Sequence, residues 1–441
     1  IGTGKEGKCM EEKLIKNYTE ILENELVPAM GCTEPIAIAY AAASARKLLS
    51  EEVKHIDLFC SGNIIKNVKA VTVPNSGGQK GMQVAAILGA IGGDSDKKLE
   101  VLTSVTDEDR EKCRSLVDSG FCIVKFVENV PKLYIRVEMR GENHAVRLDI
   151  ADQHTNIVLM EKDGEVLYKE GGEDKQNLVS TGGDRSLMSL KGILEYAEAV
   201  DLSSVEAILQ RQIDYNLSIS QEGLDNAWGA SVGKTILETW GHDVRSCACA
   251  RAAAGSDARM SGCPLPVVIN SGSGNQGITV SMPVVEYAKS LEVSKEKLYR
   301  ALIVSNLVSV YIKHYIGALS AFCGAVSASC GAGAGITYLC GGDYQKIGRT
   351  ISNTLGNVGG IVCDGAKPSC AAKIASSVHA AILAHSMSMK DQGFKGGEGI
   401  IEEDIENTIK NIGYIGKVGM LSTDREILNV MTNQVDVDSC L

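Results

Sequence analysis

Several cysteines lie in short polar turns directly before predicted helices, where a thiol can do chemistry. Cys32 lies in PAMGCTEP, where Thr33 is expected to cap the next helix; unpaired N–H groups there and the helix dipole favour thiolate over thiol. Cys363 and Cys370 lie seven positions apart in IVCDGAKPSC, so their thiols could face one pocket. Cys323 and Cys330 share one face of a Gly- and Ala-rich helix pattern. Taken singly, each cysteine is more often a small core residue.

The cellular compartment determines whether clustered cysteines are oxidised to disulfides or stay reduced. The first residues are charged throughout, with no apolar stretch before a small-residue cleavage site, so we expect a cytoplasmic protein. There the 14 cysteines are expected to be reduced, which favours metal ligation or catalysis over disulfides. Cysteines this far apart lack the CxxC spacing of structural zinc sites and are more typical of iron–sulfur ligation from separate segments. Cys247 and Cys249 are interpreted as core residues.

Two glycine-rich loops supply candidate anion sites. INSGSGNQGITVSMPVV places backbone N–H groups and polar side chains in one turn, without the GK[ST] of a Walker loop; its candidate ligand-binding residues are Ser271, Ser273, Asn275 and Gln276. VPNSGGQKGMQVAAILGAIGGD has the same character; its candidates are Asn75, Ser76 and Lys80, the lysine as a carboxylate partner. Among seven histidines, His154 at a strand boundary is the best acid–base candidate.

The net charge and the hydropathy of the chain indicate which binding partners are unfavourable. A formal charge of −11 without basic runs disfavours nucleic acid. Residues 316–340 contain no charge, but their Gly, Ala, Ser and Cys gain little from hydrocarbon, so no membrane span is expected. A small-molecule substrate is the expected partner, and the sequence leaves a homo-oligomer undecided.

Positioning these residues requires two kinds of domain. We predict an α+β protein with a helical segment at 1–54, an α/β domain at 55–180 and a mainly helical domain at 181–441. Strands are predicted in IDLFCSG, VKAVTVP, CIVKFVE, LYIRVEM and HAVRLDIA, and a strand followed by a helix in VLTSVTDEDREKCRSLVDSG. NIVLMEKDGEVLYKE predicts a hairpin turning at Asp163-Gly164, and LVSTGGDRS predicts a linker. The 47 glycines with 5 Phe and 2 Trp indicate a core of small side chains.

Five stretches together carry a family resemblance over nearly the whole chain: PAMGCTEPIAIAYAAA, AAGSDARMSG, NSGSGNQGITVSMP, the Cys323 region and VCDGAKPSCAAK. In this order they resemble the L-cysteine desulfidase family, relatives of the iron–sulfur L-serine dehydratase α chain. The resemblance implies an oxygen-sensitive 4Fe–4S cluster with one open iron and β-elimination of L-cysteine to pyruvate, ammonia and sulfide. A mainly helical catalytic domain with a smaller inserted α/β domain fits it.

The resemblance also implies site residues. Cys323 and Cys363 are expected cluster ligands; the third is either Cys370, with Cys32 held for catalysis, or Cys32 itself. His154 or Cys32 is the expected base, and Cys440 is given little weight as a further ligand. Alternatives are an L-serine dehydratase, a non-catalytic cysteine or redox sensor, and a pyridoxal-phosphate lyase using Lys367 or Lys373, which lack an adjoining phosphate cup.

Overall fold

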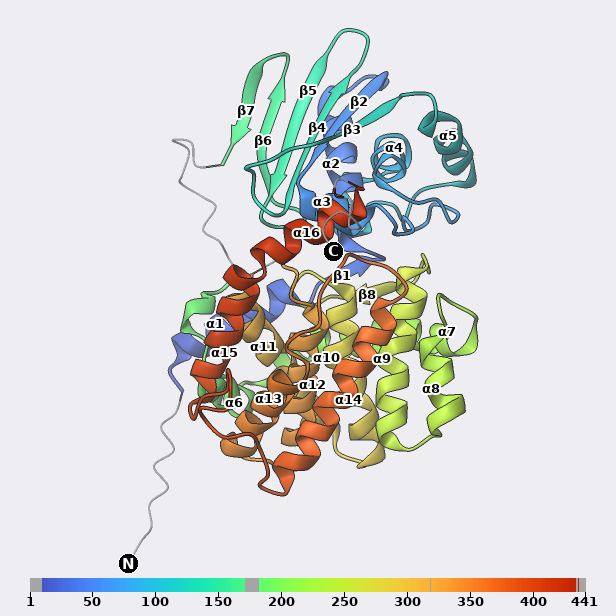
Figure 1. Cartoon of the computed structure of the whole chain (residues 1–441). Coiled ribbons are helices and arrows are strands. Elements are labelled where there is room, and N and C mark those ends of the chain that lie inside the picture. The colour runs from blue at the N-terminus through green and yellow to red at the C-terminus, as the bar shows by residue number, and fades with distance from the viewer. Residues whose placement is uncertain (1–9, 171–181, 318, 434, 436–441) are drawn as a thin grey trace, which may run out of the picture.

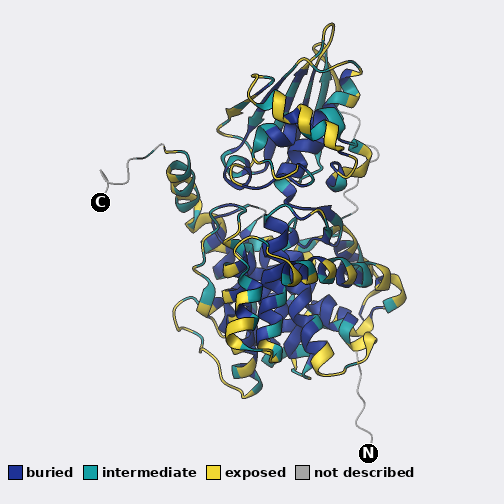
Figure 2. Ribbon diagram, turned by 90° about the vertical axis from the view of Figure 1, so that its right-hand side faces the viewer, coloured by how far each residue is buried: buried dark blue, intermediate teal, exposed yellow. Residues whose placement is uncertain are grey.

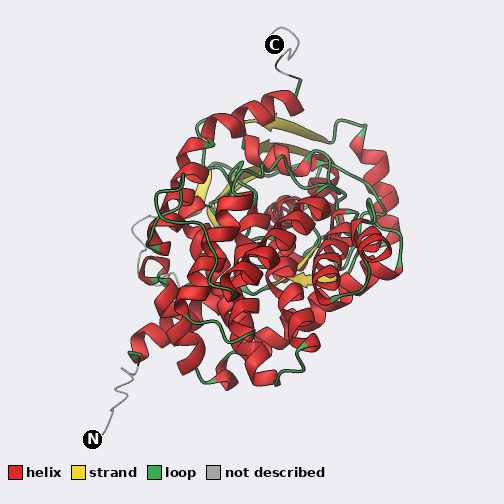
Figure 3. Ribbon diagram, turned by 60° about the horizontal axis from the view of Figure 1, so that its bottom comes forward, coloured by secondary structure: helices red, strands yellow, loops and turns green. Residues whose placement is uncertain are grey.

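The computed structural model describes residues 10–170, 182–317, 319–433 and 435. A mixed sheet with its helices lies at one end of the molecule, and a larger helical part occupies the rest (Figure 1). Viewed with the helical end forward, the molecule is mostly helix (Figure 3). The chain is mostly helical, 59%, with one six-stranded sheet, which confirms the predicted α+β class. No helix within the described residues combines the length and apolar character needed to cross a bilayer. Cys440 and part of the predicted linker, residues 178–181, lie outside the described residues.

The sheet has the order β3-β2-β4-β5-β6-β7, parallel between β2 and β3 and antiparallel elsewhere. Its strands are β2 (His55–Cys60), β3 (Cys122–Phe126), β4 (Tyr134–Arg140), β5 (Ala145–Ala151), β6 (Ile157–Lys162) and β7 (Glu165–Lys169). The hairpin between β6 and β7 turns at Asp163 and Gly164, both with positive φ, as the sequence predicts. Alternation along these strands therefore located the sheet correctly.

Two of the predicted strands are wrong. In VKAVTVP, Val68 ends α3 (Gly62–Val68), and the rest is a turn with a single bridge from Thr72 to Lys80. The start of VLTSVTDEDREKCRSLVDSG is also a turn, and only α5 (Asp107–Val117) forms there, started by a capping box at Thr106 and Asp109. Short apolar runs of this kind do not distinguish a buried turn from a strand.

Helix α2 (Thr33–Leu49) packs against β4 and β5 and against α4 (Met82–Gly92). A Cβ on Gly89 would lie 2.2 Å from the carbonyl oxygen of Ala39, so glycine is what lets these two helices touch. The predicted helical segment 1–54 is therefore divided between the two parts of the molecule. Helix α1 (Glu12–Glu25) packs on the helical part, whereas α2 belongs to the core beneath the sheet.

The helical part forms a second core, seen as a buried band in Figure 2. Small residues allow close packing: a Cβ on Gly331 would lie 2.3 Å from the carbonyl oxygen of Ser305 on the neighbouring helix. Its helices are α6 (Leu190–Ala199), α7 (Glu206–Asp225), α8 (Val232–Trp240), α9 (Val244–Met260), α10 (Gly274–Ser290), α11 (Lys295–Ile316), α12 (Gly324–Leu339), α13 (Tyr344–Val358), α14 (Cys370–Met389) and α15 (Ile405–Tyr414).

Two connections join these parts. Strands β1 (Pro28–Met30) and β8 (Pro266–Val268) pair antiparallel, so the start of the chain is tied to the loop after α9. Near the other end, α16 (Leu421–Met431) packs on α3, as Figure 1 shows. Short helical turns complete the chain at η1 (Ser95–Glu100), η2 (Arg185–Leu187), η3 (Leu202–Ser204) and η4 (Ile415–Gly419).

Candidate active site

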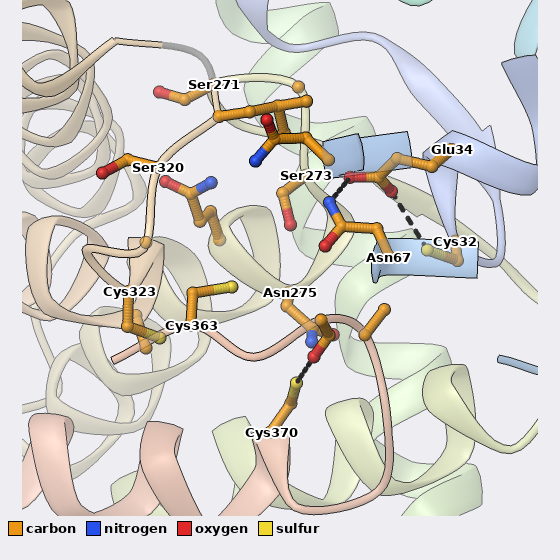
Figure 4. Close-up of a pocket in the computed structure, with 18 of the residues that line it drawn as sticks. Cys32, Glu34, Asn67, Ser271, Ser273, Asn275, Ser320, Cys323, Cys363 and Cys370 are labelled. Carbon is orange, nitrogen blue, oxygen red and sulfur yellow. Dashed lines mark hydrogen bonds between the residues drawn. The ribbon is translucent and has the colours of Figure 1, made fainter. Parts of the chain in front are cut away.

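One cavity, with a volume of about 120 Å³, is lined by residues from both parts of the molecule (Figure 4). It collects most of the residues that the sequence suggested, which are Cys32, His154, Ser271, Ser273, Asn275, Gln276, Cys323, Cys363 and Cys370. It also contains charged and amide side chains that sequence reasoning missed: Glu34, Asn63, Lys66, Asn67, Arg259 and Lys313.

Three of the cysteines approach the cavity from separate segments. Cys323 precedes α12, and its loop pairs with the Cys363 loop: the Cys323 N–H donates to Ile361 O at 3.0 Å, and the Cys363 N–H to Ala321 O at 2.6 Å. Cys370 is the first residue of α14. Figure 4 shows Cys323 and Cys363 side by side, with Cys370 approaching from α14.

These three thiols influence one another electrostatically. Burial raises the pKa of Cys323, and the neighbouring Cys363 and Cys370 raise it further. Burial likewise raises the pKa of Cys370, with Cys363 adding to it. Cys330, by contrast, is fully buried in α12 and does not line the cavity. A thiolate at Cys323 or Cys370 would therefore need compensating positive charge.

Cys32 lies on the opposite wall. It occupies the N-cap position of α2, so that Thr33 is the first helical residue rather than the cap. Its thiol donates a hydrogen bond to Glu34 Oε2 at 3.1 Å, and Asn67 Nδ2 donates to Glu34 Oε1 at 2.9 Å. Burial and the Glu34 charge raise the pKa of Cys32, which reverses the thiolate preference expected from its place at a helix start.

Glu34 is an ionised proton acceptor in this arrangement. Burial alone would raise its pKa, but His154, which is protonated in the acid range where Glu34 titrates, and the hydrogen bond from Cys32 together outweigh burial, and the pKa is lowered. Burial lowers the pKa of His154 itself, which keeps the imidazole neutral near pH 7. A Cβ on Gly272 would lie 3.2 Å from His154 Cε1, so the glycine-rich loop covers the ring.

That loop brings the start of α10 to the cavity. The Ser271 N–H donates to Glu25 Oε2 at 2.8 Å and is occupied, but Ser273 provides no side-chain cap. The first N–H groups of α10 therefore lack helical partners, and Asn275 and Gln276 of this first turn line the cavity. An anion-binding role for this turn stays a prediction.

The second glycine-rich loop lies elsewhere. Asn75 Nδ2 donates to the carbonyl oxygens of Leu102 and Val105, and Ser76 Oγ donates to Gln79 O at 2.9 Å. Neither residue lines the cavity, nor does the exposed Lys80. Asn75 thus ties this loop to the turn at residues 102–105, and Ser76 stabilises its own turn, so a similar local pattern serves a structural purpose here.

Lysines surround the cysteine loops in two groups. Lys367 and Lys373, the Schiff-base candidates, both pair with Asp364 and do not line the cavity. Lys313 on α11 is buried among the cysteines; burial lowers its pKa, and Cys363 and Cys323 oppose that shift. Lys66 pairs with Asp424 and also approaches Cys363 O, at 3.5 Å.

The donor set suits a cluster better than a single ion. Within the described residues, no three His, Cys, Asp or Glu side chains could hold one metal ion. An iron–sulfur cluster instead takes one thiolate per iron, so its ligands come from separated thiols facing a common space. Cys323, Cys363 and Cys370 meet that requirement, with the Lys313 side chain nearby.

The cavity gathers cysteine loops and a helix N-terminus in a mainly helical fold, and comparison with known families identifies the class of protein. The serine dehydratase alpha chain family model matches residues 96–429, which include Arg259 and the three cysteines but not Cys32. The chain belongs to this family, which indicates an amino-acid dehydratase or lyase type of activity.

Relatives over the full length carry the name UPF0597 protein. The chain is 53% identical to the one from Lachnoclostridium phytofermentans over 95% of this chain and 100% of the relative. It is 50% identical to the one from Desulfitobacterium hafniense over 96% and 98%, and 47% identical to the one from Finegoldia magna over 95% and 99%. The chain is thus a UPF0597 family member that contains a serine dehydratase alpha chain domain.

Proposed function

We propose that this protein is an iron–sulfur-dependent L-cysteine desulfidase, which converts L-cysteine and water to pyruvate, ammonia and hydrogen sulfide. The observation that carries the proposal is the cavity itself. Three cysteine thiols lie on one wall, and a thiol–carboxylate pair lies on the other. The family resemblance supports both the cofactor and the reaction class.

In this proposal Cys323, Cys363 and Cys370 hold a 4Fe–4S cluster. When bound, the cluster supplies a Lewis acid, an iron without a protein thiolate, that polarises the departing sulfur. The assignment leaves Cys32 free for catalysis, because its thiol bonds to Glu34 rather than interacting with the other three.

Cys32 then removes the α-proton of the substrate. Cys32 first loses its proton to solvent, a step that the nearby Arg259 charge favours, and the resulting thiolate takes the proton from Cα; Asn67 holds Glu34 in place through its Nδ2 hydrogen bond. His154, with a neutral ring and a free Nε2, is the second candidate base.

The first turn of α10 binds the substrate carboxylate. Its N–H groups are already oriented, so they stabilise the negative charge that grows on the carboxylate as the α-proton leaves. Loss of the β-sulfur as sulfide gives 2-aminoacrylate, and hydrolysis of its imine form releases ammonia and pyruvate.

Leaving-group chemistry favours L-cysteine over L-serine. Iron prefers a soft sulfur ligand to a hydroxyl, and a thiol ionises near pH 8.5, whereas an alkyl hydroxyl does not ionise in this range. Anaerobic enzyme should therefore show a higher kcat/KM for L-cysteine than for L-serine. Faster turnover of L-serine would make the protein a dehydratase, and L-cysteine binding without turnover would make it a sensor.

The ligand assignment is tested by iron and acid-labile sulfide content after anaerobic purification. Cys323→Ala, Cys363→Ala and Cys370→Ala should each lose the cluster and activity. Cys330→Ala, the matched control in α12, should keep both. A variant at any of the three positions that retains full iron removes that residue from the ligand set.

The base is tested by α-proton exchange. L-Alanine has no leaving group, so exchange of its α-proton with deuterium oxide, followed by NMR, reports proton removal alone. Cys32→Ala should keep its iron and abolish the exchange, whereas His154→Gln should not. The opposite result would transfer the role of base to His154.

A further inference from the structure

Buried polar atoms without partners concentrate in the cavity. Of the buried side-chain nitrogen and oxygen atoms that lack a hydrogen bond among the described residues, half line this one space: Asn67 Oδ1, His154 Nε2, Arg259 Nε, Asn275 Oδ1 and Gln276 Oε1. Buried polar groups in folded proteins are nearly always paired. Such a concentration marks the place where a polar ligand completes the hydrogen bonds.

Arg259 is the only arginine in the cavity lining within the described residues. It lies on α9 and is 2% exposed, and its Nε has no hydrogen-bond partner in the described part of the chain. A Cβ on Gly274 would lie 2.3 Å from Arg259 Nε, so the start of α10 lies directly against the guanidinium. A fixed cation beside free helix N–H groups binds a carboxylate.

Asn67 presents the opposite chemistry. Because its Nδ2 donates to the Glu34 carboxylate, its orientation is fixed and its Oδ1 is the atom left without a partner. A carbonyl oxygen next to a carboxylate accepts hydrogen bonds from a cation such as an ammonium group. The cavity therefore offers a cationic donor and a partly anionic acceptor as two separate features.

We propose that Arg259 binds the α-carboxylate of the substrate and Asn67 binds its α-ammonium group, so that together they select zwitterionic α-amino acids. This assignment rests on the proposed function, and it adds the two residues that determine specificity. A ligand lacking either charged group leaves one of these buried side chains unpaired, and buried unpaired groups produce strong discrimination.

Binding to the iron-loaded enzyme under anaerobic conditions tests the proposal without turnover. The probes are L-alanine, which has both charged groups, propionate, which lacks the ammonium, and ethylamine, which lacks the carboxylate. The wild type should bind L-alanine at least tenfold more tightly than either of the others. Equal affinity for L-alanine and propionate, or no L-alanine binding, would overturn the proposal.

Variants assign the two ends. Arg259→Met should weaken L-alanine at least tenfold and leave ethylamine unchanged, and Asn67→Ala should weaken L-alanine while leaving propionate unchanged. Arg245→Met, on the same helix but exposed and paired with Asp243, is the control and should bind like the wild type. Unchanged L-alanine affinity in folded, iron-containing Arg259→Met would refute the role of the arginine.

If Arg259→Met does not fold, Arg259→Lys serves instead, since a lysine keeps the charge but loses the planar donor geometry. The comparison among the three probes on the wild type needs no variant. Binding of L-alanine without L-cysteine turnover would remove the proposed desulfidase activity and leave this inference intact. Turnover of L-cysteine with unchanged KM in the Arg259 variant would overturn this inference and leave the proposed desulfidase activity intact.

Discussion

Replacing Asp424 with asparagine should release α16 from α3 while the rest of the molecule stays folded. The Asp424 carboxylate pairs with Lys66, whose side chain is 2% exposed, and accepts a hydrogen bond of 2.6 Å from Asn63 Nδ2. Helix α16 has 11 residues, none of them buried, so little apolar area holds it in place. A helix this short is marginal on its own, and its docking depends on these polar contacts.

The size of the effect follows from the burial of the pair. Removing one partner of a buried ion pair costs about 3 to 5 kcal/mol, because the other charge is left uncompensated. Undocking of α16 returns Lys66 to water, so the cost falls on docking rather than on global unfolding. Backbone amides of α16 should then exchange with deuterium roughly 100-fold faster or more. The increase is limited by the protection that docking gives these amides in the wild type.

Hydrogen-exchange mass spectrometry measures this directly. Glu426→Gln is the matched control, since Glu426 lies on the same helix and accepts only an exposed hydrogen bond, from Asn429. The double variant Lys66→Met/Asp424→Asn should recover part of the protection because no unpaired charge is left. Equal exchange of α16 in wild type and Asp424→Asn, or an equal loss in Glu426→Gln, would refute the reasoning.

Three further predictions concern other parts of the chain. Asn275→Ala should keep the cluster and lose at least tenfold in kcat/KM, about 1.4 kcal/mol, in anaerobic kinetics; unchanged kinetics would make the loop purely structural. Gly89→Ala should destabilise the α2–α4 contact by about 1 to 3 kcal/mol or more, seen in urea denaturation, because its Cβ would meet Ala39 O. Burial raises the pKa of Asp257 to about 6 from 3.8, so the folded state favours the protonated form, and the resulting stability is lost as pH rises from about 4 through about 6. Asp257→Asn should therefore exceed the wild type in stability at pH 7 by up to about 3 kcal/mol but not near pH 4, and an equal difference at both pH values would contradict this.

The sequence predicted what depends on local pattern. Alternating residues located five strands and the Asp163-Gly164 turn, because period-two burial and a positive-φ turn are written in neighbouring residues. It failed at VKAVTVP, where an apolar run forms a buried turn between α3 and α4. There the packing of distant elements, and not local preference, decides the backbone.

In the site, too, local sequence pattern predicted some features, and the packing of distant elements decided the others. Glycine-rich loops were found by composition, yet of these two loops only the one at Ser271 reaches the cavity, whereas the loop at Asn75 is bonded to the turn at Leu102. Nothing local separates them, since both use glycine and amide side chains for turn geometry. Arg259 was missed although a lone arginine in the small-residue run AAGSDARMSG is itself a signal, because a buried charge requires a partner or a ligand.

Two parts of the molecule form the wall of the cavity, so catalysis depends on how these parts are placed relative to each other. Cys32, Asn67 and His154 come from the sheet end of the molecule, whereas Arg259 and the three clustered cysteines come from the helical part. A small shift between the two parts would move the proposed base relative to the substrate without disturbing the cluster ligands, and a misplacement of about 1 Å can cost 100-fold in rate. Because α16 joins α3 to the helical part, Asp424→Asn should lower kcat for L-cysteine while iron content stays at the wild-type level. Iron loss that parallels the loss of activity would show instead that α16 stabilises the cysteine loops, through the contact of Lys66 with Cys363 O.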